Sequence, residues 1–188
     1  MKGCRSLTDQ EIINVFDTLK TLRDKTLFLL GCRSGLRISE ILSLVIKDVL
    51  EHDQVSNQVT VAKKNTKGKQ ESKTLPLTNS VKEVLKEYID SLPNKGPNQP
   101  LFKSTRGSKA ISRIQAHKIL KEAFNELKLT GKVATHSMRK TYANKVHKAL
   151  GSDILKTQVA MCHKSLSSTA SYLQVDREEV ERAILEQG

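Results

Sequence analysis

Residue types that could carry out chemistry on a phosphate occur in three short stretches of the sequence. Near the C-terminal end, Tyr172 follows His163 by nine residues. An earlier stretch contains His136 and Arg139, three residues apart, and a still earlier one contains Arg37. A phenol, two guanidiniums and two imidazoles together suggest a site that binds a phosphate and attacks it with the phenol oxygen.

Breaking a phosphodiester with a tyrosine places specific demands on the neighbouring groups. The phenol has a pKa of about 10 and must lose its proton as it attacks. Negative charge then builds on the non-bridging oxygens, where planar, permanently charged guanidiniums stabilise it well. The leaving sugar oxygen needs a proton, which a lysine can donate. The basic turn over residues 63–70 offers Lys64, Lys67 and Lys69 for this role.

Helix starts predicted from the sequence would position the arginines. Gly35 stops an apolar helix, so Arg37 stands at the start of the next one. Thr135 can cap a helix whose first turn carries His136 and Arg139. Their spacing places both side chains on one face of that turn, where backbone amides also favour a phosphate.

The tyrosine is expected on a short polar helix that begins near Ser165, while His163 ends the helix before it. Each candidate also has an ordinary explanation. Tyr172 alone would be a half-buried tyrosine, and His163 a capping histidine. Arg37 with Glu40 would be a surface ion pair, the His-x-x-Arg pair a polar helix start, and the lysines a solvated hairpin. The joint occurrence of all of them, in this order, favours a catalytic site.

Hydrophobic periodicity predicts an α+β fold that is mostly α-helical, with a small antiparallel three-stranded sheet. Thr8 and Glu11 form a capping box ahead of the first helix, and Asn79-Ser80 with Glu83 should cap a later one. A nearly apolar helix over 24–34 should be central. We expect further helices over about 38–44, 80–92, 111–127, 135–150, 153–162 and 176–187, two short strands between 45 and 63, and a third strand over 72–77.

Length and charge limit the class of protein. A chain of 188 residues fits a single domain, here residues 1–188, with residues 176–188 as a tail helix. Lys and Arg total 32 against 20 Asp and Glu, a net charge of +12. Such an excess favours an anionic polymer as partner, with a merely soluble basic surface as the alternative.

The three cysteines, Cys4, Cys32 and Cys162, show no metal-ligand spacing. Cys32 and Cys162 stand among apolar residues and should be buried, reduced thiols. The sequence contains no apolar run of membrane-spanning length and no signal region at its N-terminus. We therefore expect a cytoplasmic protein without a membrane partner.

With these motifs in view, the chain resembles the catalytic domain of the tyrosine recombinases, the phage integrase family. The resemblance extends from about Leu7 to the end. The stretches that carry it are Ser34-Gly35-Leu36-Arg37-Ile38-Ser39-Glu40-Ile41-Leu42, Thr74-Leu75-Pro76-Leu77, His136-Ser137-Met138-Arg139-Lys140-Thr141-Tyr142-Ala143, and Cys162-His163 through Tyr172.

The resemblance implies a role for each candidate. Arg37 and Arg139 would bind the scissile phosphate, and Tyr172 would form a 3′-phosphotyrosine and release a 5′-hydroxyl. His136 would act as the base or as a phosphate contact, and His163 would hydrogen-bond the phosphate.

The resemblance also implies a lysine that protonates the leaving oxygen. Lys67 is our choice, because it lies nine residues before Pro76, with Lys64 and Lys69 as alternatives. Glu40 would orient neighbouring groups. The family needs no metal or nucleotide cofactor, because the phosphotyrosine conserves the bond energy.

Function is therefore predicted as cleavage and rejoining of DNA by a site-specific recombinase. The partners would be double-stranded DNA and other recombinase protomers, with a monomer when free. The alternatives are a type IB topoisomerase and a DNA-binding regulator descended from a recombinase but no longer catalytic. The family's usual N-terminal DNA-binding domain has no room here, so we expect an excised catalytic domain or a naturally short form.

A narrow apolar stripe on the tail helix predicts that this helix packs against another part of the protein or against a second protomer. Val180, Ala183 and Ile184 form the stripe, which is too small to stabilise a lone helix of this length. The tail would either dock on its own domain or, as recombinases resembling this one often do, exchange with a neighbouring protomer.

Overall fold

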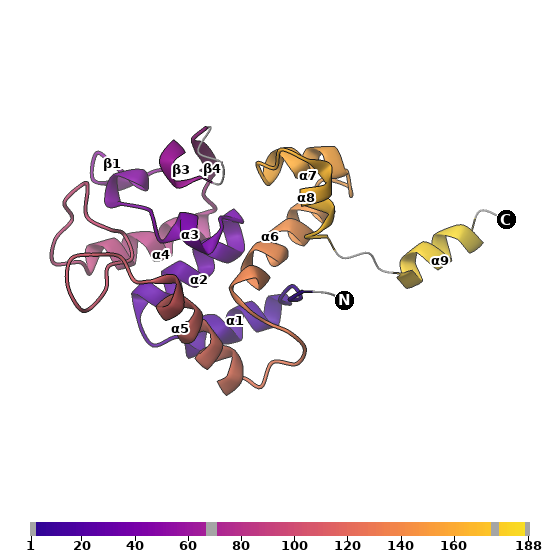
Figure 1. The fold of residues 1–188 in the computed structure, drawn as a ribbon, viewed down its shortest axis with the longest axis horizontal. Coiled ribbons are helices and arrows are strands. Elements are labelled where there is room, and N and C mark those ends of the chain that lie inside the picture. Colours follow the sequence, from indigo (N-terminus) through magenta and orange to yellow (C-terminus); the bar gives the residue numbers. More distant parts are fainter. Residues whose placement is uncertain (1–2, 67–70, 174–176, 187–188) are drawn as a thin grey trace. The chain divides into compact units, whose positions relative to one another are not determined.

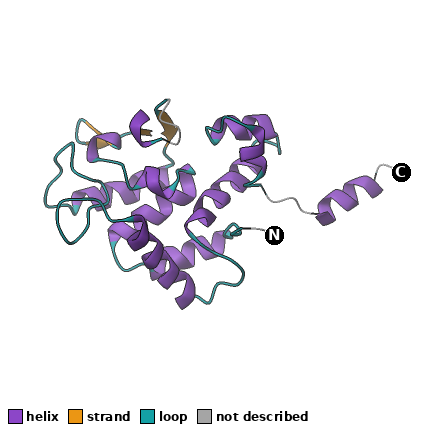
Figure 2. Cartoon of the chain, viewed as in Figure 1, coloured by secondary structure: helices purple, strands orange, loops and turns teal. Residues whose placement is uncertain are grey.

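The computed structural model describes residues 3–66, 71–173 and 177–186, the last segment without the side chains at 177–179 and 183. The described chain is mostly helical with a few short strands (Figures 1 and 2), which confirms the predicted fold class. It divides into two compact units, residues 1–142 (unit 1) and 143–188 (unit 2). The division falls inside helix α6 (Thr135–Ala149).

Helix α2 (Leu22–Ser34) is the central helix of unit 1. Nine of its thirteen residues are buried, because it is covered on nearly every side. The prediction of a central helix is confirmed. The elements that pack against α2 are α1 (Asp9–Thr18), α3 (Ile38–Ile41), α4 (Asn79–Asp90) and α5 (Arg113–Glu126).

The two predicted capping boxes had different outcomes. At α1, the Thr8 hydroxyl accepts from the Glu11 amide at 3.1 Å and the Glu11 carboxylate accepts from the Thr8 amide at 2.9 Å, so the capping box is confirmed. Helix α4 begins one residue earlier than expected, with Thr78 at the cap position. Ser80 is the second residue of the helix, and its hydroxyl lies 3.1 Å from the Thr78 hydroxyl, so the predicted Ser80–Glu83 cap is wrong.

The strands form two separate two-stranded antiparallel sheets instead of the expected three-stranded sheet. His52 and Asp53 both have positive φ, 47° and 59°, as in a two-residue type I′ turn. This turn closes the first two strands into a hairpin of their own. The short elements are η1 (Ile46–Asp48), β1 (Leu50–Glu51) paired with β2 (Gln54–Val55), η2 (Lys63–Asn65), and β3 (Gln58–Val61) paired with β4 (Lys73–Pro76).

Unit 2 contains the second half of α6 and three short helices, α7 (Ile154–Ala160), α8 (Leu166–Ala170) and α9 (Arg177–Leu185). Helices α7 and α8 pack against each other. The Ser165 hydroxyl accepts from the Ser168 amide at 3.3 Å, which confirms the predicted start of α8.

The tail helix is present as α9, within the predicted range of 176–187, although Asp176 and Gln187 lie outside the described residues. Val180 and Ile184 are 45% and 66% exposed. The described part of the predicted apolar stripe therefore faces solvent.

The cysteines follow the prediction at one position and depart from it at another. Cys32 is buried in α2, and burial raises the pKa of its thiol. Cys162 is exposed, so its predicted burial is wrong. Its φ of 49° marks a tight turn after α7 that directs the side chain outward in spite of its apolar neighbours. Within the described ranges, no helix is both long and apolar enough to span a membrane.

Candidate active site

Gly35 links the end of α2 to the arginine that follows it. Its φ of 64° lies in the left-handed region, where a residue with a side chain is strained. A Cβ at this position would lie 2.2 Å from the Tyr142 ring of α6. Backbone conformation and close packing therefore both require glycine. The tight turn sets Arg37 at the N-cap of α3, as predicted.

Arg139 reaches the same turn from α6. Its guanidinium Nη1 donates to the carbonyl oxygen of Gly35, and the residue is only 3% exposed. One α2–α3 turn thus fixes both arginines that the sequence singled out, although they are far apart in the chain. We call Arg37, Glu40, Lys73, His136 and Arg139 the arginine cluster.

Glu40 holds Arg37 in place through two contacts. One carboxylate oxygen, Oε2, accepts from the Arg37 backbone amide at 2.8 Å. The other, Oε1, accepts from Arg37 Nη1 at 3.2 Å. The Glu40 side chain is 1% exposed, so this is a buried contact and the surface ion pair considered from the sequence is wrong. Burial alone would raise the pKa of Glu40, but the hydrogen bonds and positive charges of Lys73 and Arg37 outweigh burial and lower it.

Lys73, the first residue of β4, completes the charge balance around Glu40. Its ammonium donates to Glu40 Oε1 at 2.6 Å, and its side chain is 12% exposed. Burial first, and then the positive charges of Arg37 and Arg139, lower the pKa of Lys73, while Glu40 opposes this shift. The ammonium therefore lies within the electric field of both arginines.

His136 lies in the first turn of α6 and is exposed. Its pKa is lowered first by partial desolvation and then by the positive charges of Arg139, Arg37 and Arg113. The imidazole is therefore neutral at pH 7 and can accept a proton or a hydrogen bond. Helix α6 begins at Thr135 itself, which was expected as its cap.

The tyrosine cluster lies entirely in unit 2 and consists of Asn144, His163, Thr169 and Tyr172. The His163 and Tyr172 rings are 5.5 Å apart between centroids and tilted by 36°. His163 is 8% exposed, and its Nδ1 is 3.0 Å from the hydroxyl of fully buried Thr169. This contact fixes the orientation of the imidazole beside the phenol.

Tyr172 was predicted to lie on α8, but it lies two residues beyond the end of that helix. Its amide donates to the Thr169 carbonyl at 2.9 Å, in a turn that continues from the helix end. Its carbonyl accepts from the Asn144 side chain at 3.2 Å. The phenol is thus carried by a turn that α6 supports through Asn144. Helix α8 has only five residues and ends before it reaches Tyr172.

The predicted proton donor and its two alternatives belong to the basic turn over residues 63–70. Lys67 and Lys69 lie outside the described residues, while Lys64 is exposed in η2. The part of the chain with described side chains contains no group of three or more His, Cys, Asp or Glu that could hold a metal ion.

Sequence reasoning missed Lys73, Thr169 and Arg113. Lys73 had a usable signal, since it shares one face of its strand with buried Leu75, and a lysine on a buried face needs a partner. Thr169 had none, because one threonine in a polar segment does not stand out, and Arg113 had none, because the effect of its charge on His136 depends on tertiary packing.

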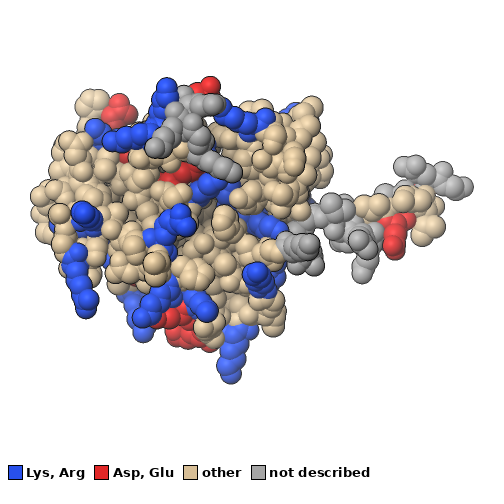
Figure 3. All heavy atoms as spheres, viewed as in Figure 1, with Lys and Arg blue, Asp and Glu red and all other residues tan. Residues whose placement is uncertain are grey.

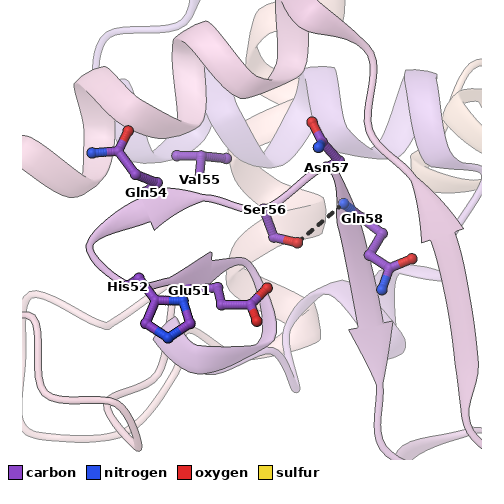
Figure 4. Close-up of a pocket in the computed structure, with 7 residues that line it drawn as sticks. All are labelled: Glu51, His52, Gln54, Val55, Ser56, Asn57 and Gln58. Atoms are coloured by element: carbon purple, nitrogen blue, oxygen red, sulfur yellow. Dashed lines mark hydrogen bonds between the residues drawn. The ribbon is translucent and has the colours of Figure 1, made fainter.

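Two further features lie on the surface, a cavity and a spread of basic side chains. A cavity of about 440 Å³ lies beside the β1–β2 hairpin, lined by Glu51, His52 and the segment 54–58 (Figure 4). Its described lining contains no member of either cluster. Lys and Arg side chains are spread over the face shown in Figure 3, with acidic side chains in small groups between them.

Comparisons with known proteins agree with these motifs. The phage integrase family matches residues 5–179. The probable integrase/recombinase YoeC of Bacillus subtilis strain 168 is 34% identical over 174 residues, 93% of this chain and 90% of that protein. The tyrosine recombinase XerC of Pelobacter propionicus is 29% identical over 154 residues, 82% of this chain and 48% of XerC. The chain thus spans about half the length of the XerC relatives it matches.

Solved structures show the same fold. The XerA recombinase has a TM-score of 0.77 at 19% identity, over 97% of this chain and 63% of its own. The XerH recombinase bound to its difH substrate has a TM-score of 0.75 at 21% identity, over 98% of this chain and 53% of its own. Since the family match covers nearly the whole chain and YoeC is similar over most of its length, this protein belongs to the phage integrase family.

Proposed function

We propose that this chain is the catalytic domain of a site-specific DNA recombinase that cleaves and rejoins DNA strands through a 3′-phosphotyrosine. The observation that carries the proposal is the shared turn of the two arginines, in which Arg139 donates to Gly35, two residues before Arg37. Two permanently charged forks held by one backbone turn suit a phosphodiester.

In the proposed reaction, the Tyr172 oxygen attacks the phosphorus and the 5′ oxygen of the next nucleotide leaves. The bond from phosphorus to the tyrosine forms as the bond to the 5′ oxygen breaks. Arg37 and Arg139 stabilise the charge that builds on the non-bridging oxygens. Neutral His136 accepts a hydrogen bond or the phenol proton, and His163 donates to the phosphate.

The leaving 5′ oxygen takes up a proton, for which Lys67 is our proposed donor, with Lys64 and Lys69 as alternatives. The reverse attack by a 5′ hydroxyl on the phosphotyrosine rejoins the strand. The bond energy is kept in the protein-linked phosphate, so the mechanism uses no metal or nucleotide cofactor.

The test is a covalent adduct on nicked duplex DNA, in which the short strand released by cleavage diffuses away. Wild-type protein should give an adduct stable to denaturing electrophoresis, with DNA linked to a peptide that contains Tyr172. Tyr172→Phe should bind DNA and form no adduct. Tyr142→Phe is the matched control, because its ring still packs on Gly35. An undiminished adduct from Tyr172→Phe, or none from wild type, contradicts the proposal.

A type IB topoisomerase would form the same adduct, so strand exchange must be measured as well. A recombinase transfers a strand between two duplexes that carry its site, whereas a topoisomerase relaxes supercoils on any duplex. Adduct formation with relaxation and no exchange would favour the topoisomerase. DNA binding without any adduct would favour the non-catalytic regulator.

We further propose duplex DNA and other protomers as partners. The net charge of +12 supports the first, and XerH, a relative in fold, has been solved bound to its DNA substrate. Affinity should fall steeply as salt rises, because phosphate contacts release counterions. Affinity that hardly changed with salt would exclude the basic surface as the binding face.

The exposed side chains of α9 support exchange of the tail between protomers. Deleting residues after Val175 should leave the fold intact and abolish cooperative binding to paired sites, while the free domain stays monomeric. If the truncated chain assembled like the full one, or unfolded outright, the tail would belong to its own domain.

A further inference from the structure

We infer that Lys73 is a positioning residue that acts through Glu40 to keep the Arg37 guanidinium available to the DNA phosphate. The inference rests on the proposed function and adds a residue that the sequence motifs did not single out.

The geometry around Glu40 is that of a shared counter-ion. A single oxygen, Oε1, accepts from Lys73 Nζ at 2.6 Å and from Arg37 Nη1 at 3.2 Å. The shorter contact is the one to lysine. The other oxygen accepts from the Arg37 amide, so both oxygens of a carboxylate that is 1% exposed have partners within the protein.

Removing Lys73 would change which cation satisfies this buried carboxylate. A buried carboxylate without enough partners is costly, and arginine pairs with carboxylates most strongly through two parallel hydrogen bonds. Arg37 would therefore turn further toward Glu40. The same fork could no longer face a phosphate with the same geometry, and Lys73 prevents this by supplying the stronger contact.

Charge balance leads to the same conclusion. Lys73, Arg37 and Arg139 carry three positive charges, and Glu40 removes one of them. The remaining two match a phosphodiester that gains a second negative charge as the phenolate attacks. Loss of Lys73 would leave one net positive charge. The transition state, with its second negative charge, should therefore be destabilised more than bound DNA.

Lys73 is not well placed to protonate the leaving oxygen. Its ammonium is 2.6 Å from a buried carboxylate, which holds its proton in a charge-assisted hydrogen bond. Proton donation and positioning can be separated by chemistry. A substrate with sulfur in place of the 5′ bridging oxygen has a leaving group that needs no proton, so it restores activity only where a proton donor was lost.

The experiment measures single-turnover cleavage of nicked duplex DNA by Lys73→Met, Lys73→Arg and the matched control Lys86→Met. Lys86 is also ion-paired, to Asp90 at 2.7 Å, but lies exposed on α4. Lys73→Met should slow cleavage by about 10- to 100-fold, less than the loss of an entire oxyanion donor. DNA affinity should change little, Lys73→Arg should restore most of the rate, and Lys86→Met should match wild type.

The bridging-sulfur substrate should not rescue Lys73→Met. Rescue would make Lys73 the proton donor and overturn the inference, as would a wild-type cleavage rate for Lys73→Met. If Lys73→Met does not fold, the double variant Glu40→Gln/Lys73→Met removes the buried charge. Because Lys73 acts through the Glu40 charge, the inference then requires the double variant to cleave both substrates at the rates of Glu40→Gln alone, and a double variant clearly slower than Glu40→Gln would overturn it. Absence of an adduct from wild type would instead refute the proposed function itself.

Discussion

The arginine cluster and the tyrosine cluster are held by different kinds of contact. In unit 1, Arg139 binds the Gly35 carbonyl across 104 residues and Lys73 binds Glu40 across 33. In unit 2, the hydrogen bond that orients His163 comes from six residues away. Tertiary packing therefore fixes the groups proposed to bind the phosphate, whereas a helix and the turn after it orient the groups around the phenol.

The two units also differ in what they bury. Unit 1 contains nearly all of the apolar core. In unit 2, the described buried side chains include polar Thr157 and Thr169, while Leu155 and Val159 of α7 are 61% and 77% exposed. Few buried apolar contacts mean a low free energy of local opening. The segment that carries Tyr172 should therefore open more readily than the arginine cluster.

The largest expected effect tests the tertiary contact. Arg139→Lys keeps the charge but loses the planar fork, so cleavage should slow by about 10²- to 10³-fold with little change in DNA affinity. Arg37→Lys should behave similarly. Single-turnover rates with Arg113→Lys as control check this, because Arg113 is exposed and its charge still acts on His136. A near-normal cleavage rate for Arg139→Lys would contradict the proposal that the guanidinium fixed on the Gly35 turn stabilises the transition state.

The next effect concerns the turn itself. Gly35→Ala should lower the free energy of unfolding by about 2 kcal/mol or more, from left-handed strain together with a clash against Tyr142. Gly107→Ala is the control, because its φ is 91° but no atom lies within 4 Å of the added Cβ. Denaturant unfolding should show a clearly smaller loss for Gly107→Ala. Equal losses would mean that packing against α6 adds nothing.

A smaller effect tests the local contact in unit 2. Thr169→Val removes the hydroxyl that bonds His163, which should cost about 1 kcal/mol of stability and slow adduct formation. Thr157→Val is a matched control, since Thr157 bonds His147 at 2.8 Å in the same unit. It should lower stability by a similar amount without slowing adduct formation. Equal slowing by both variants would make the Thr169 effect a general loss of packing.

The smallest effect concerns the pKa of His136. A lowered folded pKa means that the unfolded chain binds the proton more readily. The pKa of His136 in the unfolded chain is about 6.5, so protonation of this histidine should destabilise unit 1 as the pH falls below that value. Above that pH, His136 should cause no loss of stability. Arg113→Gln removes one of the charges that lower the pKa and should raise it slightly in an NMR titration. Arg106→Gln, another exposed arginine, should leave it unchanged.

Most helices could be predicted from the sequence, because they depend on periodicity and caps, and short motifs were enough to single out the candidate site residues. Arg37, His136 and Arg139 carry recognisable local signals, and the structure places their charges in one cluster. Lys73 is different, since its partner is 33 residues away and only tertiary packing brings Glu40 to it.

The errors have local physical causes. Two residues with positive φ closed the first hairpin and divided the expected sheet in two. Cys162 has apolar neighbours but lies in a left-handed turn, so composition alone gave the wrong burial. Tyr172 was assigned to a helix that ends two residues before it, because the sequence does not determine helix ends to within one or two positions.

The contact between Arg139 and Gly35 has a consequence for biosynthesis. Arg37, Glu40 and Lys73 are synthesised before Arg139, and the bond from Arg139 to the Gly35 carbonyl must wait until 104 further residues have followed Gly35. Tyr172 is synthesised later still. A translation product that stops before α6 therefore lacks one of the two proposed phosphate-binding arginines, and one that stops within α7 lacks the proposed nucleophile, so synthesis interrupted at either point should release a fragment unable to cut DNA.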